Sequence, residues 1–455
     1  MASSFRTSRR SVIQTAGAGA AAAAFLAAAG AVDAAPSGRT GFSAAPRHVS
    51  DQEVKLLIRD DIKSAYAAQA AVDAWQKQFP SKITLDIPPA GVDASQKIQA
   101  AQAAGDLVWD GFAVMEVPWS TESYVTRGII QPMDDLIAAS TVPNAKAVIA
   151  AIIPSIADSL KYKGKQYSIP GNVGSVALAW MTEPLKTAGI TEDPVSWDEV
   201  HTAAKAIAAK ATTFTPFDAA NDPLCDLYSM IWGATTAPIT ADGLVDITGE
   251  ASIAAINWMK MMVSENLMPP TRSANTAAVN QNFQDWQKGA TAIITSFDVA
   301  ATINQQTFGI DAAKNGLNMR RDKTKVQGGT PFWTNGSVVL DKAKNAQGVT
   351  DFLLWWFGPD NEASGKQIAT VAAKPAYQYT YDKFIKDNPA YSWQTDAIEV
   401  VRNSVPFPSN TYFQIQLQAT QPWVEKAISG DTDPAEAMAG AAKDIADQIA
   451  KLKTA

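Results

Sequence analysis

The chain has 455 residues and a net charge of −7, from 38 Lys and Arg against 45 Asp and Glu. This length is sufficient for two or three domains, and the acidic balance disfavours non-specific binding to nucleic acid or to an anionic membrane surface. The single cysteine, Cys225, excludes an internal disulfide. With only His48 and His201 beside it, we expect no metal site, no cofactor and no histidine-based catalysis.

The first 35 residues have the organisation of an export signal. Arg9 and Arg10 precede an Ala- and Gly-rich apolar run over residues 16–31, and small residues follow, with an expected cut after Ala34 or Ala35. A disordered Ala-rich tail would not account for the arginine pair ahead of the apolar run. The paired arginines predict the twin-arginine route, which exports folded proteins.

The mature protein is expected outside the cytoplasm, in the periplasm or an equivalent extracytoplasmic space. The apolar run is too short and too weakly hydrophobic for a stable membrane span. No cysteine lies near the cut, so we do not expect a lipoprotein. Residues 36–50 are expected to form a flexible leader, and removal of residues 1–35, with three Arg and one Asp, changes the net charge from −7 to −9.

Strands and helices are predicted to alternate after the leader. The first expected strands cover residues 54–58, 83–87 and 110–116, and the first expected helices cover 65–79 and 94–104. Such alternation indicates βαβ units and a mainly parallel sheet. In sheets of this kind, ligands bind beyond the carboxyl ends of the strands.

The rest of the chain continues the α/β pattern. A hairpin-like stretch at 162–170 leads through Gly and Pro, which suggest a crossing between lobes, to a strand at 176–181. Ser196 and Glu199 form a predicted capping box at the start of a helix over 197–210. Later expected elements are helices at 226–231 and 349–357 and strands at 292–295 and 337–340. Trp75 and the aromatic run 355–357 lie in apolar helical stretches, which favours packing roles for them.

An ordered series of short motifs runs through the chain. They are DGFA at 110–113, GKQYSIP at 164–170, LAWMT at 178–182, LKTAGI at 185–190, PVSWDEV at 194–200, FQDWQKGATA at 283–292 and GDTDPAEA at 430–437. Through them, residues 51–450 resemble the extracellular solute-binding proteins of family 1. These are the receptors of carbohydrate ABC importers, and maltose-binding protein is the best-known relative.

The resemblance implies a two-lobe α/β fold of the type II periplasmic-binding-protein class, with the ligand in a cleft between lobes joined by a three-crossing hinge. It places crossings near 170–174, 333–337 and 374–379. Lobe 1 is then expected over 51–170 plus 335–375, and lobe 2 over 171–334 plus 376–455. It also implies a monomeric receptor without catalysis, which binds a sugar or oligosaccharide and delivers it to the permease subunits of an ABC importer.

A sugar cleft needs flat aromatic rings for C–H faces and carboxylates or amides for hydroxyl groups. Asp61 and Lys63 follow the first strand and are implied as sugar contacts by the resemblance, although Asp61 could instead cap the next helix. Glu116 and Trp119 follow the third strand, where Pro118 breaks the strand before Trp119 and favours the cleft over the core.

Further candidates lie near the expected crossings and strand ends. The segment with Trp333 and Asn335 is the best local signal, because two aromatic residues and an amide follow the turn residues GGTP at 328–331, and Trp333 is the strongest single candidate. Each of the others has an alternative role, and they are Asn172 (or a turn residue), Trp232 (or core), Asp298 (or a helix cap) and Tyr412 (with Phe413 as its competitor).

Two other functions stay open. A secreted carbohydrate-active enzyme would need two carboxylates across the cleft, such as Asp61 with Asp298 or Glu116. Alternatively, the same receptor fold could bind a peptide, a polyamine or a sugar phosphate. Few arginines lie in the expected cleft, which disfavours a phosphate ligand.

Overall fold

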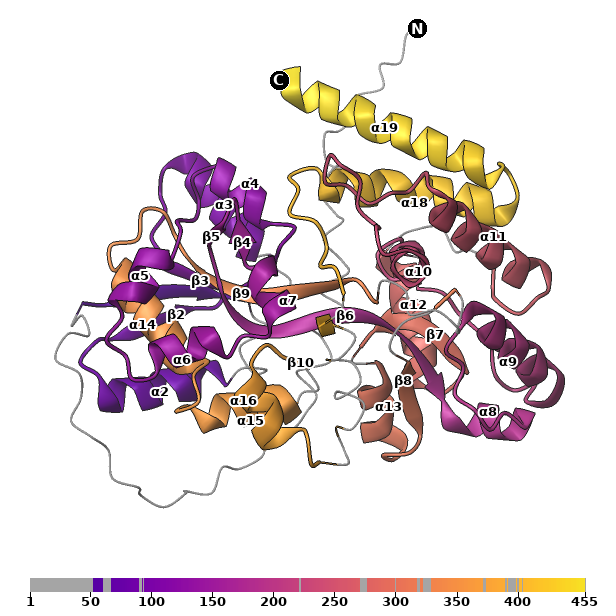
Figure 1. The fold of residues 1–455 in the computed structure, drawn as a ribbon, viewed down its shortest axis with the longest axis horizontal. Helices are drawn as coiled ribbons and strands as arrows, with labels where there is room; N and C mark the ends of the chain where they lie inside the picture. Colours follow the sequence, from indigo (N-terminus) through magenta and orange to yellow (C-terminus); the bar gives the residue numbers. More distant parts are fainter. Residues whose placement is uncertain are drawn as a thin grey trace, which may run out of the picture.

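The structure is a computed structural model, and Figure 1 shows its fold. The expected signal peptide and leader lie outside the residues it describes. Those residues are 52–59, 67–89, 92, 94–220, 222–270, 276–298, 300–316, 320–321, 329–370, 374–388, 391, 398, 401–402 and 404–454.

The elements alternate between strands and helices in the first part of the chain and are mainly helical in the second. Up to the middle of the chain they are β1 (Val54–Ile58), α2 (Ala68–Gln78), β2 (Ile83–Asp86), α3 (Ala94–Ala104), β3 (Gly111–Val117), α4 (Thr121–Thr126), α5 (Asp134–Ala139), α6 (Ala145–Ala150), α7 (Pro154–Ser159), β4 (Lys161–Tyr162), β5 (Lys165–Gln166), β6 (Ile169–Met181), α8 (Thr182–Ala188) and α9 (Trp197–Lys210). The later elements are α10 (Leu227–Ala234), α11 (Glu250–Ser264), α12 (Thr276–Gln287), β7 (Ile293–Phe297), α13 (Ala300–Phe308), β8 (Ala313–Gly316), β9 (Phe332–Val339), α14 (Ala346–Trp356), α15 (Glu362–Thr370), β10 (Lys374–Pro375), α16 (Gln378–Phe384), α18 (Phe413–Ser429) and α19 (Pro434–Thr454).

The long strand β6 runs from one half of the molecule into the other (Figure 1). Its first part pairs with β9 and β10, in a sheet of order β10-β6-β9-β3-β1-β2. Its second part, from Val176 onward, pairs with β7 and β8 instead. Among the described strands, only β1 pairs in parallel, with β2 and β3, whereas β3–β9 and all the pairings of β6 are antiparallel. The prediction of a mainly parallel sheet is therefore wrong beyond the first three strands, because the long strand β6 and its partner β9 cross the junction in opposite directions. Every residue of β6 is buried, so the link between the halves is itself part of the interior.

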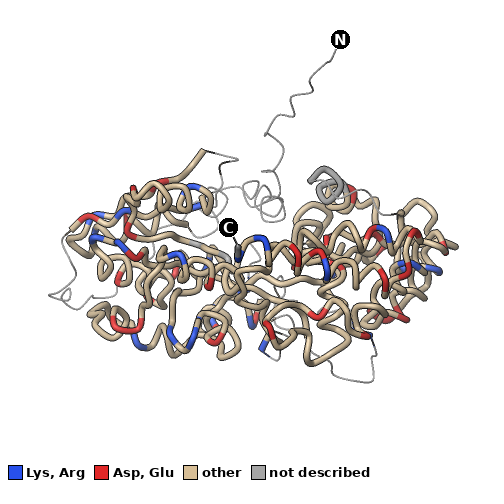
Figure 2. Tube along the Cα trace, turned by 90° about the horizontal axis from the view of Figure 1, so that it is seen from above, with Lys and Arg blue, Asp and Glu red and all other residues tan. Residues whose placement is uncertain are grey.

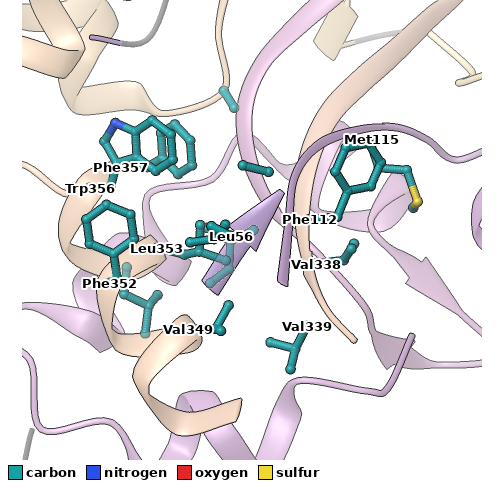
Figure 3. Packing of buried hydrophobic residues seen from close by; sticks show 14 of the residues in the cluster. Leu56, Phe112, Met115, Val338, Val339, Val349, Phe352, Leu353, Trp356 and Phe357 are labelled. Atoms are coloured by element: carbon teal, nitrogen blue, oxygen red, sulfur yellow. The ribbon is translucent and has the colours of Figure 1, made fainter. Parts of the chain in front are cut away.

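Two large hydrophobic clusters fill the two halves. The first combines β1, β3, β9 and α14, where Leu56, Phe112, Phe352 and Trp356 are fully buried (Figure 3). The second lies around α9, α10, α11 and α18. Along β6 the chain passes from the first cluster to the second over three residues. Val173 packs in the first cluster and Val176 packs in the second. The α/β fold with two lobes is therefore present, and we call the half with the first cluster lobe 1 and the other lobe 2.

One segment lies on the other side of the junction from its expected place. The sequence assigned residues 376–455 to lobe 2 and a crossing to 374–379. In the structure Tyr377, Tyr381, Ile398 and Val401 pack in the first cluster, and the second cluster resumes at Phe407. The reason is that β10 pairs with the lobe 1 part of β6, so the chain after it stays with lobe 1. The passage to lobe 2 therefore falls between Val401 and Phe407.

Most predicted elements are present with small shifts at their ends. Ser196 caps α9 by accepting from the Glu199 backbone N–H, which confirms its N-cap role, and the Glu199 carboxylate reaches back to accept from the Val195 backbone N–H and from Ser196 Oγ. Trp75 is fully buried, as expected for a packing residue. The strand expected at 337–340 is longer and begins at Phe332.

Charges of both signs are interspersed over the two lobes in the described part of the chain (Figure 2). Among the described helices, none combines the length and the apolar character that a bilayer crossing requires.

Candidate functional site at the lobe junction

Aromatic side chains from distant parts of the chain gather where the lobes meet. The Trp119 ring stacks on Phe413, with centroids 5.6 Å apart and planes at 10°. It also lies 5.7 Å from Trp333 and 5.4 Å from Phe407. Phe297 meets Trp333 edge to face at 5.7 Å. We call Trp119, Phe297, Trp333, Phe407 and Phe413 the junction aromatic cluster.

Trp119 reaches the junction from the end of β3. Strand β3 ends at Val117, and the cis peptide Val117-Pro118 leads into the turn that carries Trp119. Although Trp119 belongs to a lobe 1 segment, its side chain is 8% exposed and packs in the second cluster.

Trp333 is held against the backbone of β6. It lies opposite Gly174 in the β6–β9 pairing. A Cβ atom at Gly174 would come within 2.4 Å of the Trp333 ring, so only glycine leaves room for the indole in this position. The ring stays half-buried rather than enclosed.

An amide pair lies beside the aromatic residues. Asn172 on β6 and Asn335 on β9 are register partners, and Asn335 Nδ2 donates to Asn172 Oδ1 at 2.9 Å. Asn172 is 8% exposed and Asn335 is half-buried. The predicted residues Trp119, Asn172, Trp333 and Asn335 are thus brought together at the crossing strands.

Asp298 is engaged in a buried polar network instead of facing an open surface. Its Oδ2 atom accepts hydrogen bonds from the Ser175 N–H at 3.2 Å and Ser175 Oγ at 3.3 Å, and it is ion-paired with Lys374. Lys374 also donates to Ser175 Oγ at 2.9 Å. Lys374 is fully buried, and this burial lowers its pKa well below the ordinary value.

Trp232 and Tyr412 have different surroundings. Trp232 is fully buried, and its Nε1 donates to the Val405 carbonyl at 2.7 Å, so it is a core residue and not part of a cleft wall. Tyr412 is half-buried and directly precedes α18. The Lys453 Nζ atom lies 5.6 Å from the centroid of its ring.

Three candidates remain, and the side chains of all three lie outside the described set. Asp61 and Lys63 lie outside the described residues. The backbone of Glu116 pairs with Asn335 in the β3–β9 ladder, and its side chain lies outside the described set.

Sequence reasoning did not single out several junction residues. Phe413 was named only as a competitor of Tyr412, and Phe407, Phe297, Ser175 and Lys374 were not proposed. The stretch VPFPSNTYF at 405–413, with two prolines and three aromatic residues, contained a usable signal for Phe407.

The junction combines aromatic and amide side chains. Aromatic faces beside amide groups match a ligand with apolar C–H faces and hydroxyl groups. Within the described part of the chain, no group of three or more His, Cys, Asp or Glu side chains is arranged to hold a metal ion.

Solved structures with the same fold come from several bacteria. The sugar-binding protein MalE of Xanthomonas citri has a TM-score of 0.72 and 14% identity, over 88% of this chain and 98% of that one. The GacH receptor of Streptomyces glaucescens, solved unliganded and with acarbose, has a TM-score of 0.69 and 20% identity, over 88% and 98%. An ABC transporter solute-binding protein of Agrobacterium vitis with bound D-mannitol has a TM-score of 0.66 and 15% identity, over 88% and 99%. At identities of 14–20%, the TM-scores establish a shared fold.

Family membership rests on a match over most of the chain. The search of curated proteins found no match to this chain. Residues 70–393 match the family described as bacterial extracellular solute-binding protein, whose members act outside the cytoplasm. The chain belongs to the bacterial extracellular solute-binding proteins.

Proposed function

We propose that this protein is the substrate-binding receptor of a carbohydrate ABC importer and that it binds a sugar or oligosaccharide between its lobes. The observation that carries the proposal is that Trp333, whose ring lies 5.7 Å from that of Trp119, is two residues from Asn335 on β9, where Asn335 bonds to Asn172 of β6. The ligands named for the similar structures, acarbose and D-mannitol, are polyhydroxylated.

The aromatic and amide groups divide the recognition between them. Trp333 offers a half-exposed ring to the C–H face of a sugar, and Asn335 offers an amide to its hydroxyl groups. Asn172 provides a second amide for hydroxyl groups, and Tyr412 provides a second aromatic ring for C–H faces. Asp298 is a support residue in this proposal, because its carboxylate is already bound to Lys374 and Ser175.

The transport cycle follows from two lobes joined at β6. A ligand that contacts both lobes stabilises the closed form, and the permease subunits of the importer recognise that form. We further propose export by the twin-arginine route on the basis of Arg9 and Arg10, and no lipid anchor because no cysteine lies near the expected cut. A monomeric state is proposed from the family resemblance alone.

A thermal-shift screen tests the ligand class. Binding only to the folded state contributes about 2.7 kcal/mol at a 100-fold excess over the dissociation constant, so a true ligand raises the melting temperature. The panel is maltose, maltotetraose, acarbose and D-mannitol, with spermidine, a tripeptide and glucose 1-phosphate as the competing classes. The carbohydrate proposal would be overturned if maltose, maltotetraose, acarbose and D-mannitol all leave the melting temperature unchanged, whether or not a compound of the competing classes raises it. Turnover of a chromogenic glycoside would overturn the binding role.

A further inference from the structure

A polar contact joins the two lobes at Glu122, in the first turn of α4. The Glu122 Oε2 atom accepts a hydrogen bond from the Thr411 backbone N–H at 2.8 Å. In the opposite direction, the Glu122 backbone N–H donates to Ser409 Oγ at 3.3 Å. Two bonds of opposite sense therefore connect one helical turn to the segment 409–411.

The two sides of this contact belong to different lobes. On one side, Tyr124 of α4 packs in the first hydrophobic cluster, and the Tyr162 hydroxyl donates to Glu122 Oε1 at 2.8 Å. On the other side, Asn410 Nδ2 donates to the Asp242 carbonyl at 2.9 Å, and Phe413 packs in the second cluster. The Glu122 carboxylate thus uses one oxygen within lobe 1 and the other to hold lobe 2.

An apolar contact reinforces the polar one. Trp119, three residues before Glu122, stacks on Phe413, two residues after Thr411. Figure 1 shows α4 and α18 on the same side of β6 and β9.

We propose that Glu122 is a closure latch, a positioning residue that holds the lobes together independently of ligand and so sets how much of the receptor is ready to bind. A hydrogen bond to a charged carboxylate is about twice as strong as a neutral one. Because apparent affinity scales with the populated fraction of the binding-competent state, loss of the latch weakens binding without touching the ligand. The affinity part of this inference rests on the proposed function, whereas the lobe-closure part does not.

The decisive experiment is small-angle X-ray scattering of the ligand-free exported protein. We expect Glu122→Ala to increase the radius of gyration, because the bond between the carboxylate and the Thr411 N–H, which joins the lobes, is lost. Glu122→Gln should stay near the wild type, because its amide oxygen can still accept from Thr411. Ser409→Ala should shift the radius in the same direction by less. Glu192→Ala, at an exposed glutamate of lobe 2, is the matched control.

Affinity for maltotetraose, measured by calorimetry, provides the second readout. We expect Glu122→Ala to weaken it about tenfold through the closed population, with rescue by Glu122→Gln. An unchanged radius in Glu122→Ala, with a melting temperature near that of the wild type, overturns the latch. If maltotetraose does not bind, the scattering result still decides the latch, and only the sugar proposal is affected.

Discussion

Lys374 and Asp298 form an ion pair at the lobe junction in which the lysine is fully buried and the aspartate is 4% exposed. Lys374 comes from β10, on the lobe 1 sheet, and Asp298 directly follows β7 of lobe 2. Both also bind Ser175. At Ser175 the pairing of β6 with β9 ends, and its pairing with β7 begins at the next residue. The hinge is therefore held by a charge pair as well as by continuous strands.

Removal of one partner should be more damaging than removal of both. Lys374→Met leaves the Asp298 carboxylate buried without its cation, which typically costs roughly 3–5 kcal/mol of stability. The double variant Lys374→Met with Asp298→Asn should regain a large part of that loss, because no unpaired charge remains. Urea denaturation of the single and double variants measures the coupling.

A surface pair provides the control for the hinge pair. Lys383 pairs with Glu362, and both side chains are about half exposed or more. Lys383→Met should cost no more than about 1 kcal/mol, as is typical of exposed ion pairs. Equal losses for Lys374→Met and Lys383→Met would contradict the structural role assigned to the buried pair.

Local sequence patterns predicted the elements well, because they depend on neighbours in the chain. The N-cap role of Ser196 in α9 and the packing role of Trp75 follow from spacing alone. The junction is different. Asp298 resembles a ligand residue until Lys374, 76 positions later, is known to lie beside it. Likewise, Trp232 becomes a core residue through its bond to Val405, a pairing that no local pattern reveals.

Trp333→Ala should separate binding from stability. If the half-exposed ring stacks on the ligand, its loss should weaken binding by about 2 kcal/mol or more, the level of a hot-spot aromatic residue. The fully buried Trp232 is the matched control, because Trp232→Ala should cost roughly 3–5 kcal/mol of stability. Calorimetry and urea midpoints are measured on both variants. Intact affinity with a collapsed midpoint in Trp333→Ala would make Trp333 a packing residue.

Gly174→Ala should disturb the same ring without removing it. The added Cβ would lie 2.4 Å from Trp333 ring atoms, so the indole must move. We expect affinity to fall in Gly174→Ala but not to fall further when the change is made in a Trp333→Ala background. This double-mutant cycle is read by calorimetry. Additive losses would show that Gly174 acts through something other than the Trp333 ring.

The arginine pair near the start of the chain should determine export. Replacing Arg9 and Arg10 with Lys removes the twin-arginine signal while it preserves the charge, so precursor should accumulate in the cytoplasm. Cell fractionation followed by immunoblotting measures the distribution. Arg6→Lys, just ahead of the pair, is the control and should be exported normally. Unchanged export of the variant with both arginines replaced would exclude this route but not the binding function.

Asp226, in lobe 2, should make stability depend on pH. Desolvation by burial raises the pKa of its carboxyl from 3.8 to about 7, although Thr295 and the Ala220 N–H donate to it. Between these values the folded state binds more protons than the unfolded state. The free energy of unfolding should therefore fall as pH rises from about 4 to 7, by at most about 1.4 kcal/mol per pH unit for this one group.

Urea midpoints measured across this pH range provide the test of the Asp226 prediction. Asp226→Asn cannot ionise, so its stability should vary less with pH than that of the wild type, whatever its absolute value. The neighbouring Asp222, whose pKa burial also raises, leaves a residual slope in that variant. A wild-type stability that rises with pH between 4 and 7 would show that other groups dominate, and an unchanged slope in Asp226→Asn would remove Asp226 as the cause.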